Sequence, residues 1–133
     1  MGVNILPLNN EIDVSILLEI CNLGSLKSQL LNHKEKNKKI NSSTLYKLVN
    51  DIVFGIEYLT KKNIIHNDLS ARNVLLNSNT NEFNNSIAKI SDFGLSRKLN
   101  KIDRKLGYMI DNSNTPRPIV WLAPEILYNN IFN

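Results

Sequence analysis

The fold of this chain is best predicted from residues 64–76, which read IIHNDLSARNVLL. The segment before them, from Ser42 or Ser43 to residues 61–63, repeats apolar side chains every three or four positions. That spacing predicts a long helix with one buried face. The quoted residues lack helical spacing, so they predict a loop that follows the helix and leads into an apolar run.

Two short apolar runs, residues 73–76 and 87–90, predict a hairpin of two strands. The residues between them, 77–86, are rich in Asn, Ser and Thr and predict a polar loop. We interpret this loop as a surface insertion. Beyond Gly94 the chain has little periodicity until Trp121, which is typical of a functional or mobile segment.

The start of the chain predicts an antiparallel strand pair followed by a short helix. Residues 2–7 and 14–20 are β-branched and apolar, and residues 9–11 supply turn chemistry between them. Ser25 is a suitable N-cap for the helix. The apolar positions of that helix are Leu26, Leu30 and Leu31.

The composition fits one globular domain, because the 133 residues are 42% hydrophobic and 21% charged. We interpret the excess of asparagine as background composition. A net charge of +4 would suit a nucleic-acid partner, but much of the basic charge lies in residues 33–39 without interleaved aromatic residues. A solvated helix end or linker explains this run more simply, so no nucleic-acid partner is expected.

Cysteine usage and hydropathy describe the expected environment of the chain. Cys21 is the single cysteine, which excludes an internal disulfide and favours a reducing compartment. No window approaches the roughly 20 apolar residues of a membrane-spanning helix, so no span is expected within these residues.

The polar residues around two loops suggest a metal site. His66 and Asp68 taken alone are as typical of a turn as of a functional site. Asp92 lies in a second acidic loop that follows the strand at residues 87–90, at the same end of the predicted hairpin as Asn73. A carboxylate and an amide oxygen resemble the ligands that Mg²⁺ takes beside substrate phosphates, which leaves Asp68 free to act as a base.

Three segments in order, H-x-D-L-x-x-x-N at residues 66–73, D-F-G at 92–94 and A-P-E at 123–125, resemble the eukaryotic protein kinase family. The resemblance implies an α+β, protein-kinase-like fold. Residues 1–22 would form the last two strands of the N-lobe and the hinge. Residues 23–133 would form the first part of the helical C-lobe, with its catalytic, metal-binding and activation loops and the A-P-E segment.

The resemblance also implies a role for each residue of the catalytic loop. Asp68 would accept or orient the proton of the substrate hydroxyl, and Asn73 and Asp92 would ligate Mg²⁺. His66 and Phe93 would stack between the catalytic loop and the metal-binding loop.

By the same resemblance, residues 18–26 are similar to the hinge and the helix after it. Leu18 would be the gatekeeper, and Leu75 would pack beneath the adenine of ATP. Glu19 would offer its carbonyl to the adenine, and Cys21 its backbone amide and carbonyl.

The loop Asp68-Leu69-Ser70-Ala71-Arg72-Asn73 resembles the D-L-A-A-R-N of tyrosine kinases, in which Arg72 supplies a cation. The segment 118–121, with Pro118 and Trp121, resembles their substrate platform, although Val120 replaces its usual Lys or Arg. These features favour phosphorylation of protein tyrosine. Serine/threonine or dual specificity remains the alternative.

Several departures from the family pattern bear on activity. Asn67 replaces the arginine of H-R-D and cannot make a bidentate ionic contact with phosphate. Two interpretations of Tyr108, which would lie in the activation loop, therefore remain open: a regulatory tyrosine or an ordinary exposed one. No glycine-rich loop, strand lysine or partner glutamate precedes the hinge, and the chain ends eight residues after Glu125.

We therefore expect a fragment truncated at both ends. Its enzymatic interpretation is an ATP- and Mg²⁺-dependent protein kinase in the cytoplasm, or on the cytoplasmic side of a membrane. The alternative is a non-catalytic, kinase-like remnant that acts as a binding module.

Overall fold

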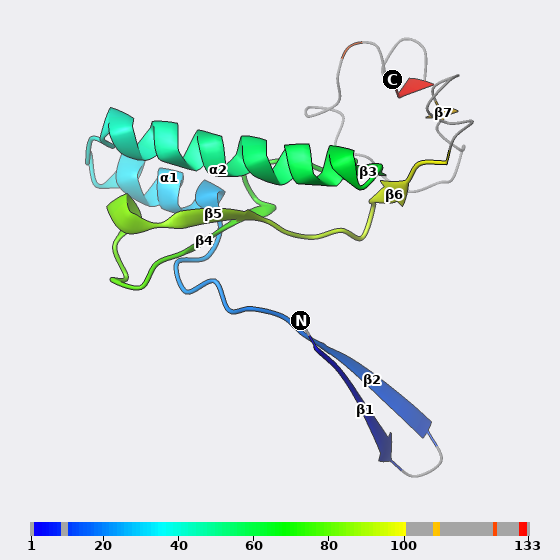
Figure 1. Ribbon diagram of the computed structural model, residues 1–133. Helices are drawn as coiled ribbons and strands as arrows, with labels where there is room; N and C mark the ends of the chain where they lie inside the picture. The colour runs from blue at the N-terminus through cyan, green and yellow to red at the C-terminus, as the bar shows by residue number, and fades with distance from the viewer. Residues whose placement is uncertain (1, 9–10, 101–107, 110–123, 125–130, 133) are drawn as a thin grey trace.

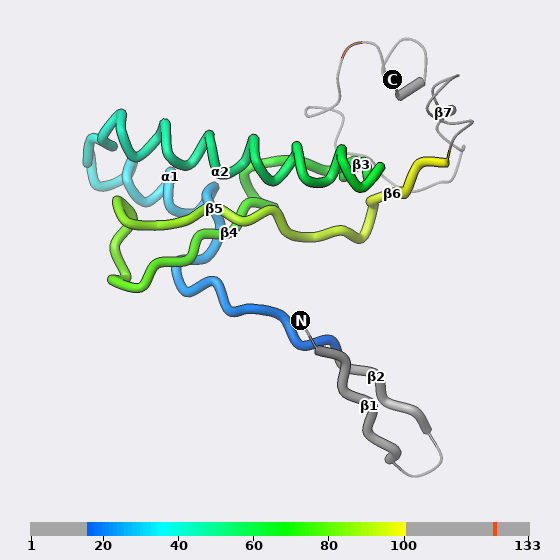
Figure 2. The backbone as a smooth tube through the Cα atoms, in the orientation of Figure 1, coloured from blue at the N-terminus to red at the C-terminus, as the bar shows by residue number. Residues whose placement is uncertain are grey.

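The computed structural model describes residues 2–8, 11–100, 108–109, 124 and 131–132, and the side chains of residues 16–100 and 124. Two helices, α1 (Leu26–Glu35) and α2 (Ser42–Lys61), lie against a hairpin formed by β4 (Val74–Asn77) and β5 (Ile87–Ile90), as Figure 1 shows. The tube in Figure 2 shows the chain reversing direction between α1 and α2. The predicted long helix and the predicted hairpin are both confirmed.

The core lies between the helices and the β4–β5 hairpin. The buried residues that form it are Leu48, Val74, Leu76, Phe83 and Ala88. Their apolar side chains are removed from water where α2 crosses the hairpin, and such burial is the main driving force of folding.

The approach of α2 to the hairpin is close at two points. A Cβ on Gly55 of α2 would lie 2.8 Å from Ile90 Cδ1 of β5, so glycine allows the contact. The Asp51 carboxylate accepts a hydrogen bond of 3.0 Å from the Ala88 amide, which occupies a donor on the edge of β5. These contacts fix the hairpin against the helix.

The ends of both helices follow from side-chain and backbone preferences. Ser25 caps α1 as predicted, accepting a hydrogen bond of 3.2 Å from the Ser28 amide, and Asn41 caps α2 through the Ser43 amide. Beyond the other ends, Asn37 and Asn63 adopt φ angles of 49° and 56°. Asparagine tolerates this left-handed conformation, which terminates a helix.

The prediction of one continuous buried face on α2 was wrong. Leu48 is 2% exposed and Leu59 is 8% exposed, but Leu45, Val49, Val53 and Ile56 expose between 38% and 55% of their surface. Leu31 of α1 is likewise 47% exposed. The spacing predicted the helices correctly, yet the neighbours in the described structure cover only part of each apolar face.

The interpretation of residues 77–86 as a surface loop holds for residues 79–82, 84 and 85, which are exposed, but not for the three buried residues Ser78, Phe83 and Ser86. A short helical turn, η1 (Phe83–Asn85), places the Phe83 side chain in the core with 9% exposure. The Phe83 ring centroid lies 4.5 Å from that of His33 on α1, and Ser86 is fully buried. The loop therefore contributes to the core.

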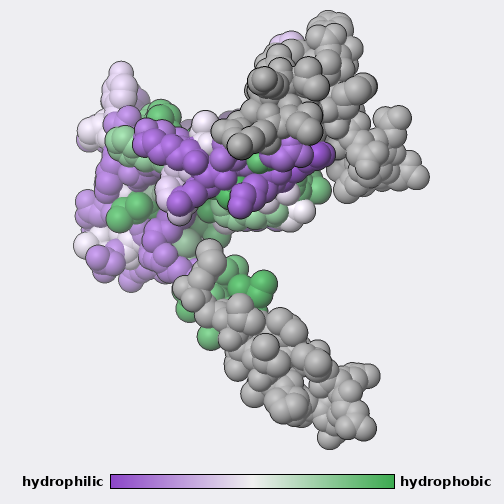
Figure 3. Space-filling model, turned by 45° about the vertical axis from the view of Figure 1, so that its right-hand side comes forward, coloured by the Kyte–Doolittle hydropathy of each residue, from purple (hydrophilic) through white to green (hydrophobic). Residues whose placement is uncertain are grey.

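The first strand pair is shifted relative to its prediction. β1 (Gly2–Leu8) pairs with β2 (Glu11–Leu17) in antiparallel register, with Ile5 opposite Val14. The second strand thus begins at Glu11, which was expected in the turn, and ends before Leu18. Apolar side chains at the end of β2 and directly after it lie on the surface, visible in green in Figure 3: Ile16, Leu17, Leu18 and Ile20.

Two very short strand pairs were not predicted. β3 (Ile64–Ile65) pairs with β6 (Arg97–Lys98), and β7 (Tyr108–Met109) pairs with β8 (Ile131–Phe132). Two-residue strands carry too little pattern to be recognised in a sequence. Within the described ranges, no helix is both long and apolar enough to cross a membrane.

Candidate active site

The loop between β3 and β4 holds Asp68 through two neighbouring side chains. Arg72 Nη2 lies 2.9 Å from Asp68 Oδ1 and 3.0 Å from Oδ2, and Asn73 Nδ2 donates to Asp68 Oδ2 at 2.9 Å. The Asp68 residue is 7% exposed. A carboxylate has about four lone-pair positions, so these three contacts orient it and still leave room for one further donor.

Asn73 also fixes the backbone of the loop. Its Nδ2 donates to the Asp68 carbonyl at 2.8 Å, and its amide N–H donates to the Ser70 carbonyl at 2.9 Å. Both hydrogens of the side-chain amide are therefore used on Asp68. The Asn73 Oδ1 remains as the acceptor that can face a cation.

Asp92 is brought to this loop by its neighbour Ser91. The Ser91 amide and hydroxyl donate to the Asn73 carbonyl at 2.8 and 2.9 Å, which places Asp92 one residue away from that contact. The Asp92 side chain is exposed, and its Oδ1 accepts from the Gly94 amide at 3.3 Å. The sequence placed Asp68, Asn73 and Asp92 in one site, and the structure brings their loops together.

His66 connects the two loops. Its Nδ1 accepts from the Asp68 amide at 3.3 Å and its Nε2 contacts the Ser91 carbonyl at 2.9 Å. Because a carbonyl only accepts, the neutral ring with its proton on Nε2 satisfies both contacts. The His66 and Phe93 ring centroids are 5.0 Å apart and the ring planes are inclined by 53°, so the two rings that were predicted to stack are in contact in a tilted arrangement.

Asn67 occupies the position of the expected arginine and makes a neutral contact instead. It has a φ angle of 65°, and its Nδ2 donates to the Leu95 carbonyl at 2.8 Å. The Leu99 amide donates to the Asn63 carbonyl at 2.7 Å further along. The segment after Asp92 is thereby fastened to the chain around the catalytic loop.

Glu19, which was predicted to lie in the hinge, is tied to the β4–β5 hairpin. Both Glu19 carboxylate oxygens lie 2.6 Å from Lys89 Nζ, and Asn77 Nδ2 donates to Oε1 at 3.0 Å. The hydrogen bonds from Lys89, followed by that from Asn77, lower the pKa of Glu19 from its ordinary value. Cys21 is half-buried, and its carbonyl accepts from the Gly24 amide at 3.2 Å, which leaves a second lone pair available.

The remaining predicted site residues differ in how far the structure describes them. Leu18 is 66% exposed, whereas Leu75 is half-buried and bridges to Ser25. Tyr108 is described only as part of β7, without its side chain. Pro118 and Trp121 lie outside the described residues.

Asn22 is a site residue that the sequence analysis missed. Its side chain accepts from the Ser78 amide at 2.9 Å and donates to the Ser78 carbonyl at 2.7 Å. This pair of bonds joins the hinge to the start of the loop at residues 77–86. A polar residue directly before Leu23-Gly24 offered no signal that its partner lies more than fifty positions away in the sequence.

The residues present fit a magnesium ion bound together with phosphate oxygens. Asn73 Oδ1 has no competing donor among the described residues, and the exposed Asp92 supplies a carboxylate. The described part of the chain contains no cluster of three or more His, Cys, Asp or Glu side chains that could bind a metal. A site of one carboxylate and one amide instead suits Mg²⁺, which usually keeps water and phosphate ligands.

Comparison with known proteins points in the same direction. Residues 3–133 match the family model described as protein tyrosine and serine/threonine kinase. The chain is 38% identical over 112 residues to tyrosine-protein kinase ZAP-70 of Mus musculus, covering 84% of this chain and 16% of that protein.

Two further relatives carry different names. The chain is 35% identical over 119 residues to tyrosine-protein kinase receptor TYRO3 of Gallus gallus, which covers 88% of this chain and 12% of that protein. It is 36% identical over 118 residues to a mitogen-activated protein kinase kinase kinase of Pyricularia oryzae, which covers 88% of this chain and 7% of that protein. The chain thus spans less than a fifth of the length of each of these relatives.

Proposed function

Since the chain belongs to the protein tyrosine and serine/threonine kinase family, we propose that it carries the catalytic loop of an enzyme that transfers a phosphoryl group from ATP to protein tyrosine. The observation that supports this most is the orientation of Asp68 by Arg72 and Asn73. Residues 1–22 then contribute N-lobe strands and the hinge, and residues 23–133 the C-lobe. The setting is the cytoplasm, or the cytoplasmic side of a membrane.

Each residue of the site has a distinct task in this proposal. Asp68 orients the substrate hydroxyl and takes its proton, using the acceptor position that Arg72 and Asn73 leave open. Asn73 and Asp92 hold Mg²⁺, and Leu75 and the backbone of Glu19 and Cys21 hold the adenine.

Bound Mg²⁺·ATP supplies the phosphoryl group with its charge partly neutralised. The protein contributes position and electrostatic complementarity, which account for most of the catalysis in phosphoryl transfer. The His66 contacts to Asp68 and Ser91 support this role, because they keep the base and the metal ligand in fixed relation.

Tyrosine rather than serine or threonine is proposed as the acceptor because of Arg72. The tyrosine-kinase loop places an arginine at this position, and here its guanidinium reaches Asp68. Pro118 and Trp121 would support the substrate, and Tyr108 would lie in the activation loop. The alternative is serine/threonine specificity, because one relative is named as a mitogen-activated protein kinase kinase kinase and not as a tyrosine kinase.

Isothermal titration of the purified chain with Mg²⁺·ATP tests the site. Saturable binding that is lost in Asp92→Ala is the expected result, and kinase assays with tyrosine- and serine-containing peptides would then identify the acceptor. A chain that is folded by circular dichroism but does not bind Mg²⁺·ATP would refute the catalytic proposal. The remaining explanation would be a non-catalytic binding module.

A further inference from the structure

The turn between α1 and α2 carries a concentration of lysine that the proposed activity does not use. Residues 26–47 contain six lysines and one acidic residue, Glu35, an excess larger than the net charge of +4 of the whole chain. All six lysine side chains are exposed. None of them takes part in the ion pairs found among the described residues.

The turn that presents these lysines is fixed by contacts on its inner side. His33 is turned inward, with its Nδ1 2.8 Å from the Gln29 carbonyl and its ring against Phe83. Ile40 packs against the core, and Asn37 makes the left-handed step between them. Because the backbone is held, little backbone conformational entropy remains to be lost when the lysines bind a partner, and the cost that remains is that of ordering their side chains.

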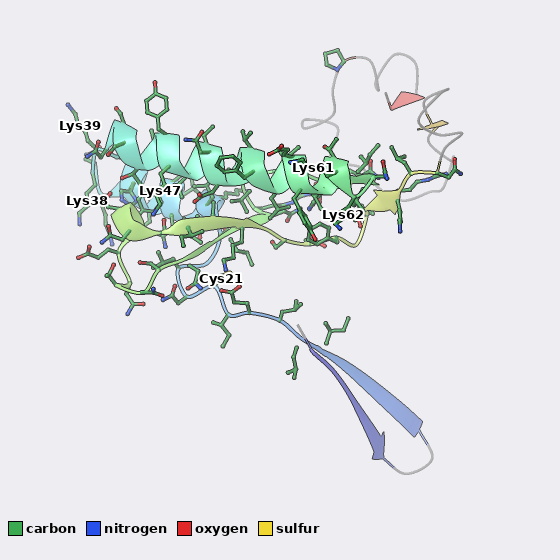
Figure 4. All side chains as sticks on the ribbon, in the orientation of Figure 1. Cys21, Lys38, Lys39, Lys47, Lys61 and Lys62 are labelled. Carbon is green, nitrogen blue, oxygen red and sulfur yellow. The ribbon has the colours of Figure 1, made fainter. Side chains whose placement is uncertain are left out.

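The lysines occupy one end of α2. Figure 4 shows Lys38, Lys39 and Lys47 at the end where α2 begins, and Lys61 and Lys62 at the end where it finishes. A helix of 20 residues is about 30 Å long. The lysine-rich end is therefore separated by most of that length from His66 and Asn67, which line a hollow with the last turns of α2.

The shape of this end favours a flat partner. It is a protruding turn. One hollow of the described structure is lined by Glu19 and residues of the β4–β5 hairpin and its loop, and another by the end of α2 and the loop at residues 64–69. Tyr46 is the one aromatic side chain exposed beside the lysines on this part of α2. None of the lysines of the turn lines either of these hollows, and Tyr46 alone does not form a row of stacking aromatics for nucleic acid on this described surface.

We propose that the lysine-rich turn, residues 34–39 together with Lys47, binds the surface of an anionic lipid bilayer. A cluster of lysines near such a surface is attracted to its negative potential. A chain docked in this way keeps the catalytic loop away from the lipid and open to a protein substrate. The proposal does not depend on catalysis, because it concerns a surface at the other end of α2.

The test uses two matched pairs of adjacent lysines in the full chain. Sedimentation with phosphatidylcholine vesicles, with and without phosphatidylserine, measures the partition of the native chain, Lys38→Gln/Lys39→Gln and Lys61→Gln/Lys62→Gln. Each lysine near the surface should contribute about fivefold, so the first variant should bind about 25-fold more weakly. The second should change less than about twofold, because its charges lie beyond a Debye length of about 10 Å.

Three results would overturn the proposal. The first is failure of the native chain to bind phosphatidylserine vesicles better than pure phosphatidylcholine, and the second is an equal loss in both pairs. The third is binding through Lys38 and Lys39 to an oligonucleotide or a polyglutamate peptide without binding to vesicles, which would assign the turn to that partner. Lys38→Arg/Lys39→Arg should retain vesicle binding, and circular dichroism confirms that each variant is folded.

Discussion

Replacement of Asn73 by alanine should destabilise the chain by a predictable amount. The Asn73 amide donates to the Asp68 carbonyl at 2.8 Å and to Oδ2 at 2.9 Å, and the two residues are 6% and 7% exposed. A hydrogen bond to a charged group contributes about 1.5–3 kcal/mol and a neutral one about 1 kcal/mol. Since Arg72 still pairs with Asp68, we expect Asn73→Ala to lower the free energy of unfolding by about 2–4 kcal/mol.

Asn77→Ala is the matched control, because it also removes an amide that donates to a carboxylate. Asn77 Nδ2 lies 3.0 Å from Glu19 Oε1, but the Glu19 side chain is 57% exposed. Water replaces the lost donor at such a position, and exposed charged contacts contribute only about 0–1 kcal/mol. The difference between the two variants therefore isolates the effect of burial.

Urea unfolding followed by circular dichroism measures both variants, with the free energy obtained by linear extrapolation. The slope against urea should remain unchanged, since neither substitution alters the surface exposed on unfolding. Equal losses of stability in Asn73→Ala and Asn77→Ala would refute the reasoning. So would a loss below about 1 kcal/mol in Asn73→Ala, because the Asp68 contacts would then not hold the loop.

Three further predictions concern the core, pH and the hinge. Phe83→Ala should lower the free energy of unfolding by about 3–5 kcal/mol. Phe54 is 66% exposed, so Phe54→Ala should change that free energy by less than about 0.5 kcal/mol. Similar losses of stability for the two variants in urea unfolding would contradict the core role of Phe83. Lys89 lowers the pKa of Glu19, so its stabilisation is present above the ordinary value of 4.5 and lost as pH falls through the lowered pKa. Glu19→Gln should abolish this part of the pH dependence in urea titrations, and an unchanged profile would disprove it. Cys21→Ser should leave Mg²⁺·ATP binding by calorimetry unchanged, since only backbone groups of Cys21 are proposed to contact adenine, and weaker binding would implicate the sulfur.

Elements with a strong local pattern were predictable from the sequence. α2 and the β4–β5 hairpin follow from apolar spacing, and Ser25 from capping preference, because these signals depend on neighbours within a few positions. The α+β class is confirmed. What the spacing could not predict is which part of the α2 face is covered, because the residues that pack on Leu48 come from distant segments.

The loop at residues 77–86 shows why composition can mislead. Its Asn, Ser and Thr residues predicted a solvated insertion, and residues 79–82, 84 and 85 are exposed, yet Phe83 is buried in the core. The single aromatic residue in that polar stretch was the available signal. Ser78 and Ser86 are buried because their polar groups find hydrogen-bond partners there, which average polarity does not report: the Ser78 amide donates to the Asn22 side chain and the Ser86 hydroxyl donates to the Phe83 carbonyl.

Motif order predicts which residues share the candidate site, but not their hydrogen bonds. Asp68 and Asn73 precede one strand of the hairpin and Asp92 follows the other, so the sequence predicts that their loops lie at the same end. Arg72 Nη2 contacts both Asp68 carboxylate oxygens, and this contact depends on side-chain geometry that cannot be predicted from the spacing of residues in the sequence. The bridge that Ser91 forms between the loops likewise requires its amide and hydroxyl to reach the Asn73 carbonyl, which the spacing of residues does not predict.

Asparagine, interpreted from composition as background, has a structural role at several positions. Of the five non-glycine residues described with positive φ, four are asparagines: Asn37, Asn63, Asn67 and Asn81. Asparagine is one of the few residues that adopt this conformation at low cost. The composition of the chain therefore helps to end its helices and to shape the loop that contains Asn67 and Asp68.

The contacts of Asn67 also determine how the segment after Asp92 is held. The Asn67 amide reaches the Leu95 carbonyl, and the Leu99 amide reaches the Asn63 carbonyl, so both links are neutral. Salt screens the attraction between charges but has little effect on a neutral hydrogen bond. These two hydrogen bonds should therefore be insensitive to ionic strength, in contrast to an attachment through an arginine and a phosphate.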